Sequence, residues 1–222
     1  MATLSRSSVL PKRIIKSLAV PFLRARFKRG VRGFPAPYQL HFGCGSHHLD
    51  GWINIDFIRT PAVDLWWNIG WPVPLKDDSC QYIFHEHVLE HFELRRGLEL
   101  LRECHRLLRP GGILRVAMPS LDHMLAQCAS GEWRSHRSPH MPAVATRAEF
   151  LNVNFRHWGH QWIYDGEELH RRLREVGFEA IRDVERHQSE CDALRGIEYR
   201  ADSLLICEAV KTDDACTAGP SA

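Results

Sequence analysis

The chain has 222 residues, of which 44% are hydrophobic and 25% charged, so it fits one globular domain with an appendage and excludes a wholly disordered, collagenous or membrane-embedded protein. The formal net charge of +2 conceals an asymmetry, because nine of the 29 basic residues precede Asp50, the first acidic residue. The remainder has 20 basic against 27 acidic residues, a net charge of −7 that disfavours nucleic acid as a partner.

The seven cysteines are scattered and form no CxxC pair. This spacing favours a reducing compartment and argues against a disulfide framework or a thiolate zinc site. We therefore expect a cytoplasmic protein. The start of the sequence is rich in arginine and free of acidic residues. If the source is eukaryotic, an organellar transit peptide is therefore an alternative interpretation of this segment.

Residues 1–36 form a basic arm that ends in the breaker-rich segment Gly33–Pro37. Within it Ile14, Leu18 and Phe22 recur at helical spacing, with an expected interruption at Pro21. Such a pattern fits either peripheral contact with an anionic membrane or a helix packed over the core, and the second is the commoner case. We place the main domain at 37–211 and a flexible tail at 212–222.

From residue 38 onward, short apolar runs alternate with helical stretches. Four strands are predicted first: Tyr38–Phe42, Trp52–Asp56, Val63–Trp67 and Gln81–His85. A helix over Leu94–Leu108 follows, stopped by Pro110-Gly111-Gly112. After it we expect a strand at Ile113–Met118, a long polar region at 120–164, a helix at Asp165–Val176 and two closing strands, Phe178–Val184 and Leu204–Val210.

This alternation predicts an α/β fold: a Rossmann-like, doubly wound, mainly parallel sheet with an antiparallel closing strand, in a three-layer sandwich. Ligands of such sheets bind beyond the carboxyl ends of the strands. The first of these ends is Gly43-Cys-Gly45, and Asp56 closes the next strand only 11 positions later. That spacing is too short for a full crossover helix, which disfavours a dinucleotide and favours a nucleoside ligand without a pyrophosphate.

Five segments in this order resemble the class I S-adenosylmethionine-dependent methyltransferases, and most closely the small bacterial type 11-like members. They are LHFGCG (40–45), GWINID (51–56), PLKDDSCQYIFHEHVLEHF (74–92), LLRECHRLLRPGGILRVAMPSLD (100–122) and YDGEELHRRLREVGF (164–178). The resemblance implies a methyltransferase with S-adenosylmethionine as its cofactor, acting on a small-molecule or glycan acceptor, with O-methylation as our expectation.

The resemblance also implies which residues hold the cofactor. Phe42, Gly43, Cys44 and Gly45 would border its methionine part and Asp56 its ribose. Asn68 and Ile69 would meet the adenine, and His85 would line the pocket. Asn68 stands where the family commonly has an aspartate, and an amide can still hydrogen-bond an adenine edge.

The segment after the fourth predicted strand contains candidate catalytic residues. His87 is expected to act as general base on a hydroxyl acceptor, with Glu86 beside it. His87-Val-Leu-Glu90-His91 also matches the HxxEH pattern of zinc peptidases, for which Glu167 is a conceivable third ligand. We keep a zinc hydrolase as a remote alternative and expect no metal in the leading interpretation.

The region 120–164 is rich in histidine and tryptophan and is predicted to form a lid on the acceptor side, around Phe155–Trp162. His157 in this lid is a third candidate catalytic residue. The region contains five histidines whose spacing matches no diagnostic metal-binding pattern: His123, His136, His140, His157 and His160. A catalytically idle, cofactor-binding version of the fold is the main alternative to an active methyltransferase.

Overall fold

The computed structural model describes residues 12–135 and 142–213, with side chains from residue 20 onward. Its helices are α1 (Lys12–Gly30), α2 (Leu94–Leu107), α3 (Leu121–Ser130), α4 (Arg147–Arg156) and α5 (Gly166–Glu175), with 3-10 turns η1 (Val31–Gly33), η2 (Leu89–His91), η3 (Glu132–Arg134) and η4 (Asp192–Leu194). The strands are β1 (Tyr38–Phe42), β2 (Ile53–Asp56), β3 (Leu65–Trp66), β4 (Cys80–Glu86), β5 (Leu108–Met118), β6 (Phe178–Asp183) and β7 (Leu205–Lys211). In the described part of the chain, no helix is long and apolar enough to cross a membrane.

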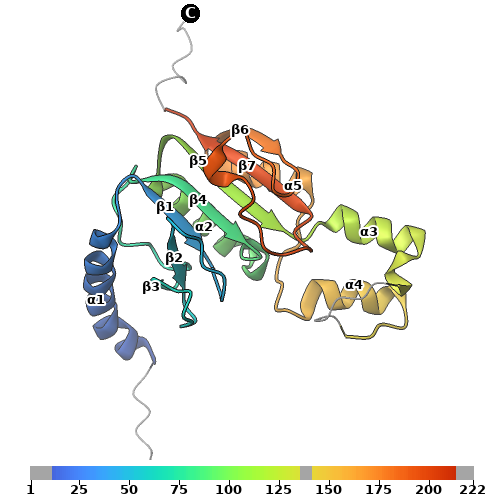
Figure 1. The fold of residues 1–222 in the computed structure, drawn as a ribbon. Coiled ribbons are helices and arrows are strands. Elements are labelled where there is room, and N and C mark those ends of the chain that lie inside the picture. The colour runs from blue at the N-terminus through green and yellow to red at the C-terminus, as the bar shows by residue number, and fades with distance from the viewer. Residues whose placement is uncertain (1–11, 136–141, 214–222) are drawn as a thin grey trace, which may run out of the picture.

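The seven strands form one sheet in the order β3-β2-β1-β4-β5-β7-β6 (Figure 1). The pairings among β1 to β5 are parallel, and β7 pairs antiparallel with both β5 and β6. This confirms the predicted fold class. Because the parallel strands share a direction, the carboxyl ends of β1, β2, β4 and β5 meet at one edge of the sheet, where ligands of such folds bind.

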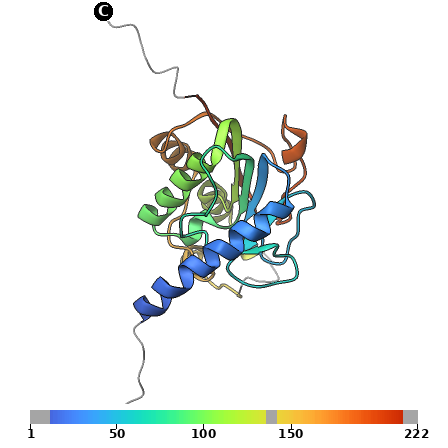
Figure 2. The ribbon, with the colours of Figure 1, turned by 90° about the vertical axis from the view of Figure 1, so that its left-hand side faces the viewer.

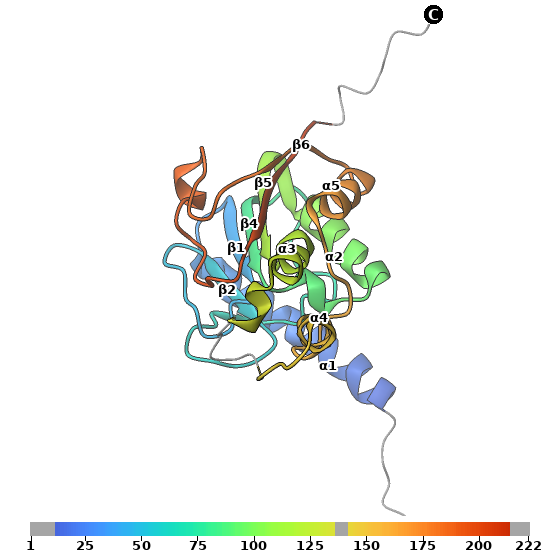
Figure 3. The same cartoon turned by 90° about the vertical axis from the view of Figure 1, so that its right-hand side faces the viewer.

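The two faces of the sheet are covered differently. Seen edge-on, α2 and α5 lie on one side and the β6–β7 connection with η4 lies on the other (Figure 3). The helical side holds the main apolar core, including Leu40, Ile83 and Leu101. The β1–β2 connection contains no helix, as its length predicts, so the second face is closed by the β6–β7 connection instead.

The helix α1 lies along the sheet edge at β3 (Figure 2). It continues through Pro21, where the sequence predicts an interruption, since a proline removes one backbone donor without ending every helix. Phe22 is exposed, but Phe27 and Val31 are buried in the main core, and the Phe27 ring meets Trp67 at 5.4 Å between centroids. The end of α1 therefore packs over the core, and contact of the arm with a membrane stays a prediction.

The region 120–164 contains two helices that the sequence analysis missed, and Figure 1 shows α3 and α4 projecting together beyond the sheet. Each begins at a side-chain cap: Ser120 Oγ accepts from the His123 backbone N–H at 3.2 Å, and Thr146 Oγ1 accepts from Glu149 at 3.1 Å. Their apolar residues form a small core of their own, centred on Met124, Trp133 and Phe150. The residues between them, 136–141, which include His136 and His140, lie outside the described part.

The turn at Pro110-Gly111-Gly112 also differs from the prediction. It does not separate α2 from the next strand, because β5 begins at Leu108 directly after α2 and includes this turn. Gly111 has a φ of 75°, a left-handed conformation that favours glycine. The turn is therefore an irregularity inside a long strand.

A buried group of charges ties the β6–β7 connection to the second face. Arg115 on β5 is fully buried and pairs with Glu198 of the connection and, at 2.5 Å, with Glu208 on β7. Arg115 also donates to the Gln188 carbonyl oxygen at 2.9 Å. Removing one member of such a group leaves the others charged in a dry interior.

We therefore expect Arg115→Ala to lower the free energy of unfolding by about 3–5 kcal/mol, measured by urea denaturation. The matched control is Arg102→Ala on α2, whose side chain is 54% exposed and lies 3.7 Å from Glu175. An exposed ion pair contributes about 1 kcal/mol or less. Equal losses in the two variants would contradict a structural role for the buried charges.

Candidate functional site

The loop that follows β1 has the geometry of a ligand-binding turn. Gly43 and Gly45 both adopt left-handed backbone conformations, with φ of 67° and 55°. A side chain on Gly43 would collide with Val88, whose Cγ2 lies 2.3 Å from the position of a Cβ. A Cβ on Gly45 would meet nothing within 4 Å, so the loop faces open space there.

The Asp56 carboxylate connects the end of β2 to this loop. Its two oxygens accept the backbone N–H groups of Gly45 at 2.8 Å and Ile58 at 2.7 Å. A carboxylate oxygen has two lone pairs, so each oxygen can accept a further hydrogen bond from a ligand hydroxyl. The Cys44 thiol beside it is buried, and burial together with the Asp56 charge raises its pKa to about 12, so it stays protonated.

Asn54 and Asp64 support the same loop, and the sequence analysis did not single them out. The Asn54 side chain accepts the Leu49 backbone N–H at 2.9 Å and donates to Asp64 at 2.9 Å. It also lies 3.0 Å from the buried His41 ring, whose pKa is lowered to about 4, chiefly by burial. The sequence signal for Asn54 was a side-chain amide between two isoleucines of the strand.

The predicted adenine-side residues lie after β3. Asn68 is half-buried, and its Oδ1 accepts the Gly70 backbone N–H at 2.9 Å. Ile69 belongs to the main core, and Phe42 is fully buried at the end of β1. Phe42 thus directly precedes the glycine loop and Asn68 holds a turn after β3, while contact of Asn68 and Ile69 with an adenine stays a prediction.

At the end of β4, His85 and Glu86 point into the protein. His85 is fully buried, neither ring nitrogen has a hydrogen-bond partner among the described residues, and burial lowers its pKa to about 3. Glu86 accepts from the Ser203 hydroxyl at 2.5 Å and from the backbone N–H groups of Tyr199 and Arg200. Through these three bonds the Glu86 carboxylate holds the β6–β7 connection in place, and its catalytic role stays a prediction.

That connection reaches the glycine loop. The Tyr199 ring stacks on His47, two residues beyond Gly45, with 4.1 Å between the ring centroids. Glu86 thereby positions an aromatic cover beside the candidate cofactor site. The composition of the β6–β7 connection does not indicate that it folds back toward the glycine loop, so no role was predicted for it.

His87 lies at the carboxyl end of β4 in a left-handed conformation, with φ of 52°, and its backbone N–H bonds to the Ala117 oxygen at 2.9 Å. Its Nδ1 is 3.4 Å from Glu90 Oε1, and its Nε2 is 3.5 Å from Asp202 Oδ1. Burial, only partly offset by Asp202, lowers the pKa of His87 to about 3. The ring is therefore neutral near pH 7 and a weaker base than the sequence analysis assumed.

The predicted lid, around residues 155–162, contacts the turn that follows His87 through His160 and not through His157. His157 is exposed next to Trp158, whereas the His160 ring lies 4.9 Å from the His91 ring. The backbone N–H of Gln161 donates to the Glu90 carbonyl oxygen at 2.7 Å. Spacing along the sequence could not distinguish these two histidines.

The HxxEH interpretation is wrong in its geometry. The pattern requires two imidazoles one helical turn apart, but residues 89–91 form a short 3-10 turn that His87 precedes in a non-helical conformation. Glu167, the conceivable third ligand, is exposed in the first turn of α5. We do not retain the zinc hydrolase.

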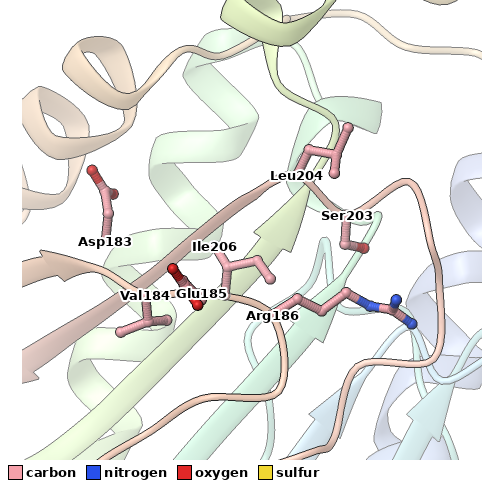
Figure 4. Close-up of a pocket in the computed structure, with 7 residues that line it drawn as sticks. All are labelled: Asp183, Val184, Glu185, Arg186, Ser203, Leu204 and Ile206. Atoms are coloured by element: carbon pink, nitrogen blue, oxygen red, sulfur yellow. The ribbon is translucent and has the colours of Figure 1, made fainter.

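A hollow of about 360 Å³ lies elsewhere, where the β6–β7 connection leaves β6 and enters β7 (Figure 4). Asp183, Glu185 and Arg186 line it, together with Ser203. Ser203 also donates to Glu86, so the hollow borders the β6–β7 connection. None of the predicted cofactor residues lines this hollow.

The sequence profile of the methyltransferase domain family matches residues 21–183. The chain belongs to this family. It is an S-adenosylmethionine-dependent methyltransferase, which confirms the resemblance drawn from the five motifs. No curated protein sequence matches the chain significantly.

Solved structures show partial likeness at low identity. A possible exported protein from Bordetella parapertussis is 15% identical, with 96% of this chain and 75% of that chain covered and a TM-score of 0.49. An S-adenosylmethionine-dependent methyltransferase from Archaeoglobus fulgidus is 16% identical, with coverages of 86% and 94% and a TM-score of 0.48. The family assignment rests on the profile and not on these likenesses.

The residues present fit the methyltransferase cofactor. The open space at Gly45 admits a ligand close to the backbone, and Asp56 offers lone pairs for two ribose hydroxyls. Bound S-adenosylmethionine would supply an electrophilic methyl group. The chain's own task is to hold the cofactor and orient an acceptor.

Replacing Asp56 by alanine should weaken binding of S-adenosylhomocysteine by at least about 100-fold, because it removes two charged hydrogen bonds contributing about 1.5–3 kcal/mol each. Isothermal titration calorimetry measures this change. The control is Asp50→Ala, whose side chain is fully exposed. Unchanged affinity in Asp56→Ala would show that the ribose lies elsewhere.

Proposed function

We propose that this methyltransferase transfers its methyl group to a hydroxyl oxygen of a small-molecule or glycan acceptor. The observation that carries this proposal is the neutral His87 imidazole beside the glycine loop. Val88, the next residue, packs against Gly43, so His87 lies next to the segment that borders the cofactor. An imidazole in that position is suited to a hydroxyl acceptor, which must lose a proton as it is methylated.

The low pKa of His87 determines how it would act. A ring with a pKa of about 3 does not remove a proton from a free hydroxyl, but its lone pair accepts a hydrogen bond and orients the oxygen. The proton would pass to the ring as the oxygen–carbon bond forms and the bond between that methyl carbon and the cofactor sulfur breaks, and the Asp202 carboxylate at 3.5 Å from Nε2 would stabilise the resulting charge. Orientation alone is worth about 7–11 kcal/mol of a barrier.

Aromatic side chains on the segment that carries His160 support a sugar-like acceptor. Trp162 is 36% exposed, and the Trp158 ring lies 5.8 Å from the His160 ring. Flat apolar faces with a polar edge provide binding surface for ligands that carry both apolar and hydroxyl groups. The net charge of −7 on the chain from Asp50 onward disfavours a nucleic acid acceptor.

Turnover on hydroxylated acceptors tests this proposal. The protein is incubated with S-adenosylmethionine and a panel of sugars, nucleotide sugars and glycans, each paired with its deoxy analogue, and methylated products are identified by mass spectrometry. We expect His87→Gln to lower kcat by about 100-fold, the low end of what a positioned base contributes, with S-adenosylhomocysteine affinity unchanged.

The control variant is His170→Asn on α5, whose ring pairs with Asp183 at 2.8 Å. It should keep the wild-type kcat. Methylation of amines alone would contradict the hydroxyl assignment. Cofactor binding without turnover on any acceptor would favour the catalytically idle version of the fold.

A further inference from the structure

Three side chains with potential metal-ligand atoms lie close together near the carboxyl end of β4. Glu90 and His91 belong to the turn η2, and His160 comes from the connection between α4 and α5. One carboxylate oxygen and one nitrogen from each ring all lie within 4.8 Å of one another. We name these three residues the Glu90 cluster.

The Glu90 carboxylate makes no hydrogen bond among the described residues, and its nearest charged neighbour is the His87 ring, whose Nδ1 lies 3.4 Å from Oε1. The Glu90 side chain is 98% buried. A carboxyl group taken out of water is costly unless it is hydrogen-bonded, paired or bound to a metal.

One of the two histidines is oriented as metal ligands usually are. His160 Nδ1 lies 2.7 Å from the Asn154 carbonyl oxygen, which can only accept, so Nδ1 carries the proton and Nε2 carries the lone pair. The His91 ring lies beside the backbone of Gly159. A ligating histidine almost always donates its other N–H to such a second group.

The two segments are also fastened to each other. Gln161 donates its backbone N–H to the Glu90 backbone carbonyl oxygen at 2.7 Å and its side-chain Nε2–H to the His91 backbone carbonyl oxygen at 2.6 Å. These bonds fix the His160 segment against η2 independently of any ligand. Preorganisation of this kind reduces the cost of assembling a site.

We propose that the Glu90 cluster binds one divalent transition-metal cation, for which Zn²⁺ is the best match. Two imidazoles and one carboxylate form a three-ligand set that leaves a fourth tetrahedral position open. Ligand atoms about 2.0–2.1 Å from zinc lie about 3.3 Å apart, so small side-chain rotations would close the cluster from its present spacing. The nearby Arg200 charge is offset by Asp202, whose Oδ1 is 3.4 Å from Arg200 Nε.

A second group in the described chain, His170, Asp183 and Cys207, has similar spacing but differs in one respect. His170 Nε2 and Asp183 Oδ1 already pair at 2.8 Å, and Asp183 is exposed to water. It contains no buried unpartnered carboxylate. This group therefore provides an internal control and not a second proposal.

Metal content of the purified chain, with any affinity tag removed, tests the proposal. The protein is stripped with a chelator and titrated with Zn²⁺ by calorimetry, and Co²⁺ is added separately to record the visible spectrum of a tetrahedral site. We expect one Zn²⁺ per chain. Loss of a second-shell partner costs about 10- to 100-fold in affinity, so Glu90→Gln and His160→Asn should each weaken binding by at least about 100-fold.

The matched control is His170→Asn, which should bind Zn²⁺ like the wild type. Glu90→Gln keeps the shape of the side chain, and circular dichroism establishes that it folds. Failure of the wild type to bind stoichiometric Zn²⁺ would overturn the proposal, as would equal binding by His160→Asn, which would place the metal on the free cysteines or another group. These readouts do not depend on methyl transfer, so they stand apart from the proposed acceptor.

Discussion

The Asp56 carboxylate joins the end of β2 to the loop after β1, and the geometry of the cofactor site depends on this connection. With only ten residues between the strands, no helix is available to set the shape of the glycine loop. The loop is shaped instead by left-handed glycines, by Val88 packed against Gly43, and by the Asp56 bonds to Gly45 and Ile58. A compact nucleoside fits such a loop better than a ligand whose pyrophosphate needs a long helix N-terminus.

The second face of the sheet is organised by buried charge. Arg115, Glu198 and Glu208 hold the β6–β7 connection against β5 and β7, and Glu86 holds the far end of the same connection. Tyr199 is thereby brought over the glycine loop. In other proteins, replacing a whole group of buried charges by apolar residues often leaves the stability unchanged. The buried charges here therefore fit a need to hold the connection in one defined position.

Much of the fold followed from local patterns. The bounds of β1 agree with the prediction, and Asp165 caps α5 as expected, because its Oδ1 accepts the Glu168 backbone N–H at 2.8 Å. The region 120–164 did not follow, since it was predicted as one polar region and the caps at Ser120 and Thr146 were overlooked. The glycines and the acidic residue at the strand ends could be predicted as candidate site residues, because a parallel sheet brings those ends together.

The acceptor side could not be derived in the same way. His157 and His160 are three residues apart, and only the hydrogen bonds of Gln161 to η2 decide which of them lies beside Glu90. Glu86 and Glu90 are the same residue type in the sequence, yet Glu86 accepts three hydrogen bonds and the Glu90 carboxylate accepts none among the described residues. Such differences arise from tertiary packing and leave no periodic signal.

Backbone amide hydrogen exchange with and without S-adenosylhomocysteine tests the central claim, that the cofactor binds at the loop held by Asp56. The account predicts slower exchange at Gly45 and Ile58, whose N–H groups bond to that carboxylate, with α3 and α4 unchanged. Unchanged exchange across residues 43–58, with protection at the hollow lined by Asp183 and Arg186 instead, would contradict it.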